Sequence, residues 1–127
     1  MMKTLLSTLS LLALFLSASA HAESAAFTQA RFDTLQKEGK PILVAIHADW
    51  CPTCRAQTKI LVPLLSNSKY KNVSSLRVDF DDQKDIVKYF KATQQSTLIV
   101  FKDGKEVGRS TGETSADKIE QLVQKSL

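Results

Sequence analysis

The two cysteines of the chain, Cys51 and Cys54, are separated by two residues and follow the apolar run 41–46. Near-continuous hydrophobicity predicts a buried central strand, and Pro52 suits the first turn of a helix. The pattern therefore predicts a strand that delivers two thiols to the beginning of a helix. Residues three apart on a helix face one another, and a bridge between them closes almost no loop. Such a disulfide adds little to the stability of the folded state, and it is suited to reversible electron transfer.

The beginning of a helix favours negative charge, because its first N–H groups are unpaired and its dipole is positive there. Cys51 comes first, so we expect it to be an exposed nucleophile with a lowered pKa. We expect Cys54, one turn further, to resolve the mixed disulfide and release the reduced substrate. The alternatives are a structural disulfide, half of a zinc site and chance spacing. The strand before, the helix after and the flanking Trp50 favour redox chemistry.

Periodicity and turn signals predict an alternating chain that ends in a hairpin and a helix. Pro63 is expected to kink or end the second helix, and Asp103-Gly104 predicts the hairpin turn. Thr28 is expected to cap the first helix, and a capping box is expected at 114–117. The predicted fold class is α/β, with a mixed sheet of about four strands and helices on both faces. The predicted helices cover 27–38, 51–63, 82–91 and 114–127, and the strands 41–46, 76–81, 97–101 and 106–110.

Residues 1–22 have the features of a secretory signal peptide. Lys3 supplies a positive start, an apolar stretch runs from 5 to 16, and Ala20-His21-Ala22 is an A-x-A-like cleavage site. The stretch is shorter than the about 20 residues that a membrane span needs. We therefore expect export, with cleavage after Ala20 or Ala22, and one domain over residues 23–127.

The formal net charge of +4 is spread along the chain without a basic block. This distribution is typical of a solvated surface and argues against nucleic-acid binding. The acidic cluster lacks the glycine spacing of a calcium loop, and we interpret it as strand and helix-start charge rather than a metal site. Its members are Asp79, Asp81, Asp82 and Asp85.

The run 50–55, W-C-P-T-C-R, is similar to the W-C-x-x-C-[KR] motif of the thioredoxin family. The run 101–106 resembles the hairpin of that family, and Gly112 stands where a glycine usually precedes its last helix. The resemblance covers nearly all of residues 23–127. It implies a thioredoxin fold and thiol–disulfide exchange without an organic cofactor, with Cys51 attacking and Cys54 resolving.

The chain departs from the family pattern at Ser96, which stands where the family usually has a cis-proline. A cis bond before a residue other than proline costs about 3–4 kcal/mol. We therefore expect a trans Gln95–Ser96 bond and a reshaped substrate groove. The Ser96 hydroxyl could donate to a thiolate, or Ser96 could be an ordinary serine at the start of a strand.

Two further departures lie on the strand before the motif. Ala45 replaces a buried aspartate that thioredoxins use in proton transfer, and His47 replaces an aromatic residue. An imidazolium near Cys51 would favour the thiolate; the alternative is a packed histidine at a strand end. Asp49 is interpreted as a solvated partner of the helix dipole. The expected surroundings of the cysteines are His47, Trp50, Pro52, Thr53, Gln95 and Ser96.

The leading hypothesis is an exported, monomeric thiol–disulfide oxidoreductase that acts on protein disulfides. It would exchange electrons with a membrane-bound or periplasmic redox partner. The first alternative is a module that binds or delivers Cu(I), for which thiolates are suitable ligands. The second is a binding domain that keeps the fold with an inert bridge. The candidate copper ligands are Cys51 and Cys54, with His47 and Ser96 nearby.

Overall fold

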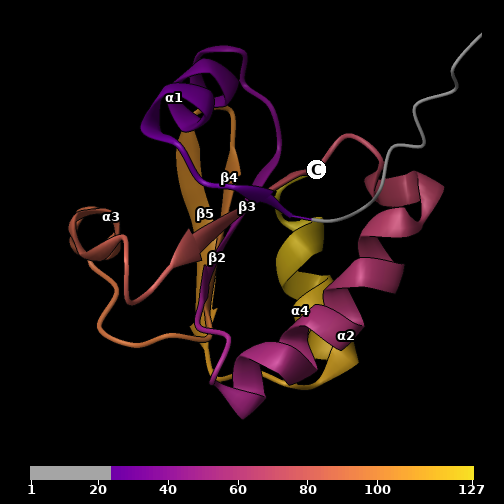
Figure 1. The fold of residues 1–127 in the computed structure, drawn as a ribbon. Coiled ribbons are helices and arrows are strands. Elements are labelled where there is room, and N and C mark those ends of the chain that lie inside the picture. The colour runs from indigo at the N-terminus through magenta and orange to yellow at the C-terminus, as the bar shows by residue number, and fades with distance from the viewer. Residues whose placement is uncertain (1–23) are drawn as a thin grey trace, which may run out of the picture.

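The computed structural model describes residues 24–127, which fold around a five-stranded mixed sheet (Figure 1). The strand order is β1-β3-β2-β4-β5. β1 and β2 pair in parallel with β3, whereas β4 pairs antiparallel with both β2 and β5. The strands are β1 (Ala25–Ala26), β2 (Ile42–His47), β3 (Ser74–Asp79), β4 (Thr97–Lys102) and β5 (Lys105–Thr111).

The α/β fold with helices on both faces is confirmed. Figure 1 shows α2 and α4 on one face of the sheet and α1 and α3 on the other. A short 3-10 helix, η1 (Ser68–Tyr70), follows α2. Among residues 24–127, none of the helices is long and apolar enough to span a bilayer. The helices are α1 (Gln29–Lys37), α2 (Pro52–Ser66), α3 (Lys84–Tyr89) and α4 (Ala116–Gln124).

Alternating residues of β2 separate the two cores, because successive side chains on a strand point to opposite faces. Val44 and Ile46 pack into the core under α1 and α3, together with Phe32 of α1. Leu43 and Ala45 pack into the core under α2 and α4. β2 is buried along its whole length, as predicted, since strands flank it on both sides.

The prediction of about four strands missed β1. A two-residue strand is too short to show period-two alternation, and it is defined by its pairing with β3, at Ala25 with Leu76 and Ala26 with Arg77. β3 also begins and ends two residues earlier than predicted. The Oδ1 of Asp79 accepts hydrogen bonds from the backbone N–H groups of Asp81 and Asp82, both at 2.9 Å, and so turns the chain.

The prediction that Pro63 kinks or ends its helix is wrong for the helix end, because α2 continues to Ser66. Proline removes one backbone hydrogen bond from a helix. Here Leu61 and Leu65, on either side of Pro63, are buried against the sheet. Their packing holds the last turn, since most helical stability in proteins comes from a buried face.

The caps of the first and last helices differ from one another. Thr28 caps α1 as predicted, with its Oγ1 accepting from the Arg31 N–H at 3.2 Å. The capping box predicted at 114–117 is absent. Instead Oε1 of Glu113 accepts from the N–H groups of Thr114 and Ser115, so α4 begins only at Ala116. The predicted third helix is also shorter, and α3 covers Lys84–Tyr89.

The hairpin between β4 and β5 is confirmed. Asp103 and Gly104 adopt φ angles of 50° and 77°. Positive φ at both central residues is what a two-residue type I′ turn requires.

Candidate active site

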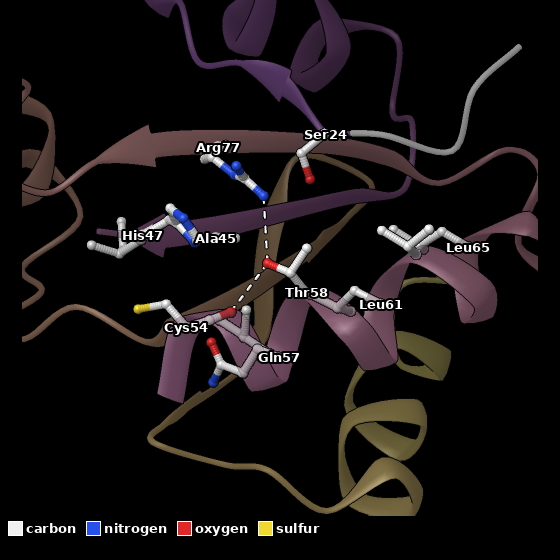
Figure 2. Close-up of a pocket in the computed structure, with 12 residues that line it drawn as sticks. Ser24, Ala45, His47, Cys54, Gln57, Thr58, Leu61, Leu65 and Arg77 are labelled. Carbon is white, nitrogen blue, oxygen red and sulfur yellow. Dashed lines mark hydrogen bonds between the residues drawn. The ribbon is translucent and has the colours of Figure 1, made fainter. Parts of the chain in front are cut away.

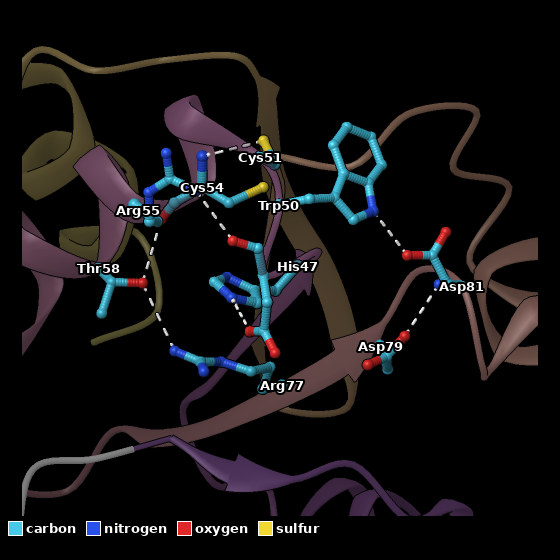
Figure 3. Close-up of polar contacts among 10 residues, drawn as sticks. His47, Trp50, Cys51, Cys54, Arg55, Thr58, Arg77, Asp79 and Asp81 are labelled. Carbon is cyan, nitrogen blue, oxygen red and sulfur yellow. Dashed lines mark hydrogen bonds and ion pairs between the residues drawn. The ribbon is translucent and has the colours of Figure 1, made fainter.

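The structure places the two thiols where β2 passes into α2. Cys51 is the N-cap of α2, in extended conformation, and Pro52 is the first helical residue. The backbone N–H of Cys54 donates to the Cys51 Sγ at 3.1 Å (Figure 3). The Cys51 sulfur therefore occupies the position at which an N-cap side chain accepts a hydrogen bond from the first turn. Both cysteines are free thiols.

Cys51 is not exposed, contrary to our expectation. Its exposed fraction is 2% and that of Cys54 is 1%. The two thiols form a small apolar cluster with Ala48, and Phe80 packs against it. The N-cap position alone predicted exposure, but this cluster covers the cap. By contrast, the neighbouring Trp50 is 58% exposed.

The surroundings drive the pKa values of the two thiols apart. Burial acts to raise the pKa of Cys51, but hydrogen bonds from Cys54, the Thr53 N–H and the Gln95 side chain outweigh it, so its pKa is lowered. Burial, and after it the contact with Cys51, raise the pKa of Cys54 to about 11. One thiol is thus prepared to ionise while the other retains its proton, a division typical of acid–base pairs in active sites.

The indole of Trp50 is held beside the cysteines by an acidic residue. Its Nε1–H donates to Oδ2 of Asp81 at 2.7 Å (Figure 3). On the other side of the motif, Nη1 of Arg55 donates to the backbone oxygen of Asp49 at 3.0 Å. Asp81 therefore has a specific role in orienting Trp50, which the sequence pattern did not reveal.

The segment that faces the thiols is built around Ser96. The Gln95–Ser96 bond is trans, as predicted, since residues 24–127 contain no cis peptide bond. Ser96 adopts φ 60°, and its N–H donates to the Ile46 oxygen at 2.8 Å. The same N–H helps to offset the raised pKa of Cys54. The Ser96 hydroxyl, by contrast, forms no hydrogen bond to either cysteine within the described residues, so the backbone is the part of Ser96 that acts on the site.

Gln57 was not singled out from the sequence, although it anchors this segment. It is 3% exposed, and its Nε2 donates to the backbone oxygens of Ser96 and Glu113, both at 3.0 Å. It therefore ties α2 to the chain before β4 and to the chain before α4. The available signal was an amide three residues after Cys54 on a face that is otherwise apolar.

His47 lies on the Cys54 side of the site. It is 9% exposed, and its Nε2 is 3.0 Å from Oδ1 of Asp49. The groups that lower the pKa of Cys51 are Cys54, Thr53 and Gln95. His47 is therefore not among the groups that favour the Cys51 thiolate. Asp49 pairs with His47, in addition to its expected place near the positive end of the helix dipole.

A cavity of about 310 Å³ opens behind Cys54, between β2 and α2 (Figure 2). The small side chain of Ala45 leaves this space next to Arg77, its register partner on β3. Nη2 of Arg77 donates to Oγ1 of Thr58 at 3.4 Å, whereas its buried Nε has no hydrogen-bond partner among residues 24–127. His47 and Cys54 line the same cavity.

The structure does not assemble the metal site of the copper alternative. Within residues 24–127, no group of three or more His, Cys, Asp or Glu side chains is close enough to hold a metal ion. The acidic residues near β3 instead bind backbone N–H groups and Trp50, as described above.

Comparison with known proteins agrees with this architecture. The thioredoxin family model matches residues 23–125. Thioredoxin of Chlamydia muridarum is 37% identical over 84 residues, which cover 66% of this chain and 80% of that protein. The crystal structure of Trxlp from Edwardsiella tarda is 38% identical, with a TM-score of 0.77, over 80% of this chain and 98% of that one.

Thioredoxin NaTrxh of Nicotiana alata has a similar structure at lower identity. It is 26% identical, with a TM-score of 0.70, over 87% of this chain and 97% of that one. The family match includes the segment in which α2 begins at the Cys51–Cys54 pair. The chain belongs to the thioredoxin family.

Proposed function

We propose that this protein is a thiol–disulfide oxidoreductase that acts on protein disulfides. The observation that carries the proposal is the difference in pKa between the two thiols. Cys51 accepts the N–H of Cys54 and has a lowered pKa, whereas the pKa of Cys54 is raised to about 11. The membership of the thioredoxin family supports disulfide oxidoreductase chemistry in general. The protein substrates are the part that we infer.

The reaction proceeds by two exchanges. The Cys51 thiolate attacks one sulfur of a substrate disulfide, a Cys51–substrate bond forms, and the other substrate sulfur leaves as a thiolate. Cys54 then loses its proton and attacks the Cys51 sulfur. The Cys51–Cys54 bond forms, and the second substrate thiol is released. Two protein thiols are oxidised and one substrate disulfide is reduced.

The exposed Trp50 supports a protein substrate rather than a small one. Its ring is 58% exposed, next to the thiols, and its Nε1–H is fixed by Asp81. A large aromatic side chain with one polar end satisfied is typical of contact surfaces between proteins.

Insulin reduction, followed as precipitation of the freed B chain in the presence of dithiothreitol, tests the proposal. Wild type is expected to accelerate precipitation, and Cys51→Ala to reduce the rate to that of dithiothreitol alone. Without dithiothreitol, Cys54→Ser is expected to accumulate a covalent complex with the substrate, because the resolving thiol is lost. Asp103→Asn, in the exposed turn between β4 and β5, is the control. Wild-type activity in Cys51→Ala would contradict the proposal.

Our proposal includes export and a redox partner in the compartment outside the cytoplasm. It is supported by the pattern of residues 1–22, and the family match begins at residue 23. We expect fractionation of bacteria that express the full chain to yield a periplasmic form that begins at Glu23 or His21. Leu12→Arg, which interrupts the apolar stretch, should leave the full chain in the cytoplasm. A full-length wild-type chain in the cytoplasm would contradict export.

A further inference from the structure

Resolution of the mixed disulfide requires that Cys54 lose a proton inside the protein. Its exposed fraction is 1%, and its pKa is raised to about 11 by burial. At neutral pH the proton therefore needs an acceptor near the sulfur. The cavity behind Cys54 is the space in which such a group can lie.

The side chains that line this cavity include a single base that can accept a proton near neutral pH. Arg77 is permanently charged, and the other lining residues are apolar side chains, hydroxyls, an amide and Cys54 itself. The remaining group is His47, and histidine gains and loses its proton between about pH 5 and 8. Figure 2 shows the His47 ring and the Cys54 sulfur at the same end of the cavity.

Asp49 selects the form of the His47 ring that can accept a proton. Oδ1 of Asp49 lies 3.0 Å from Nε2 of His47. Because an ionised carboxylate only accepts hydrogen bonds, Nε2 carries the hydrogen and donates it. The neutral ring then has its free lone pair on Nδ1, as in other sites where a carboxylate orients a histidine base.

We propose that His47, oriented by Asp49, accepts the proton of Cys54 during resolution through water in the cavity that both residues line. This inference rests on the proposed function and assigns the base of its second step. A volume of about 310 Å³ has room for water molecules, which occupy about 30 Å³ each in the liquid. The proton of Cys54 S–H passes through water to Nδ1, and the Cys54 sulfur attacks Cys51. The electron pair of the Cys51–substrate bond leaves with the substrate sulfur, which takes a proton from the imidazolium or from solvent.

The charged groups around His47 come from three elements. Asp49, in the loop after β2, stabilises the imidazolium once it forms. On β3, Asp79 is the register partner of His47, and Arg77 lines the same cavity as His47. On α2, Cys54 becomes anionic only when its proton leaves. Because His47 must be neutral to accept a proton, resolution is expected to accelerate as the pH rises from about 5 to 8.

The test uses the full chain and Ellman's reagent in excess, followed by stopped flow. Attack by Cys51 releases one thionitrobenzoate, and attack by Cys54 on the mixed disulfide releases the second. Thionitrobenzoate leaves as a stable anion, so the second phase reports proton loss from Cys54. We expect His47→Gln to slow the second phase at least tenfold at pH 7.5. Without the base its rate should follow the thiolate fraction of Cys54 and rise about tenfold per pH unit, whereas the wild-type rate should level off towards pH 8. The first phase should change less than twofold.

Asp49→Asn keeps the shape of the side chain and removes its charge. It is expected to slow the second phase about two- to fivefold, because Asp49 is exposed and its hold on the ring is weak. The matched control Asp103→Asn, an equally exposed aspartate at the distant hairpin, should match wild type in both phases.

Each result decides a separate question. If His47→Gln matches wild type in the rate and pH profile of the second phase, the inference is wrong while the proposed function stands. If His47→Gln does not fold, a wild-type second phase that rises about tenfold per pH unit up to pH 8 without levelling overturns the inference. If the first phase survives in Cys51→Ala, it is the proposed function that fails.

Discussion

The two faces of the sheet differ in how they are packed. Under α1 and α3, aromatic rings fill the core, and Phe32 meets Phe90 and Phe101 edge to face at centroid distances of 5.3 and 5.1 Å. On the other face, a cavity of about 310 Å³ lies under α2 beside Cys54. The same strand lines both, with Val44 and Ile46 on the first face and Ala45 and His47 on the second.

The first face mainly stabilises the fold, whereas the second face holds the reactive groups. Contacts between closely packed apolar groups stabilise the first face. The second face has fewer of these contacts, and the buried side chains of Gln57 and His47 and the half-buried Arg77 lie around the resolving thiol. Polar or incompletely packed regions are found where a protein needs reactive groups rather than maximal stability.

The same substitution on each face tests the contrast most directly. Leu35→Ala on α1 is expected to lower the free energy of unfolding by about 4 kcal/mol, and Leu61→Ala on α2 by about 2 kcal/mol. Both leucines are buried, but Leu61 borders the cavity and has fewer neighbours to lose. Urea unfolding of both variants measures the difference. Equal losses would show that the cavity face is packed as tightly as the other.

A pH series of the reduced protein tests the second face. Because the folded pKa of Cys54 is raised to about 11 from an unfolded value near 8.5, the unfolded chain ionises first as the pH rises. Stability should therefore fall between about pH 8.5 and 11. Cys54→Ala is expected to flatten that fall in urea unfolding, whereas Cys51→Ala, whose thiol has a lowered pKa, should not. A fall that is unchanged in Cys54→Ala would contradict this cause.

Replacement of Gln57 tests whether its amide stabilises the second face. Gln57→Leu keeps the approximate volume but removes the donor to the backbone oxygens of Ser96 and Glu113. We expect a loss of about 1–3 kcal/mol, since two hydrogen bonds are lost at about 0.5–1.5 kcal/mol each, although the Ser96 oxygen still accepts from the Gly112 N–H. Gln121→Leu, at an exposed position on α4, is the control and should lie within about 0.5 kcal/mol of wild type. A neutral Gln57→Leu would show that the Ser96 segment is held by other contacts.

The smallest effect is expected from partly filling the cavity. Ala45→Val adds two methyl groups where there is space, so the free energy of unfolding should stay within about 1.5 kcal/mol of wild type. The same change at Ala48, which is 1% exposed within the thiol cluster, should cost more through overpacking. Thermal unfolding of both variants compares them, and a larger loss at Ala45 would mean that the space is not available to a side chain.

Local patterns predicted most of the fold. The apolar run 41–46 predicted β2, and Asp103-Gly104 predicted the hairpin. The alternation over 76–81 predicted the last four residues of β3. These signals depend on neighbours in the chain, so they can be recognised without a partner. β1 could not be recognised in this way, because two residues carry no period and only pairing with β3 defines them.

By itself, the sequence determined that two thiols meet at the beginning of a helix, because spacing and helix geometry decide that locally. Only the tertiary structure decided that Cys51 is buried under Phe80, that Gln57 holds Ser96, and that His47 shares a cavity with Cys54. Each of these contacts joins segments that come together only when the sheet and its helices pack. Burial and hydrogen bonding make the pKa values of the two thiols differ, and both arise from that packing.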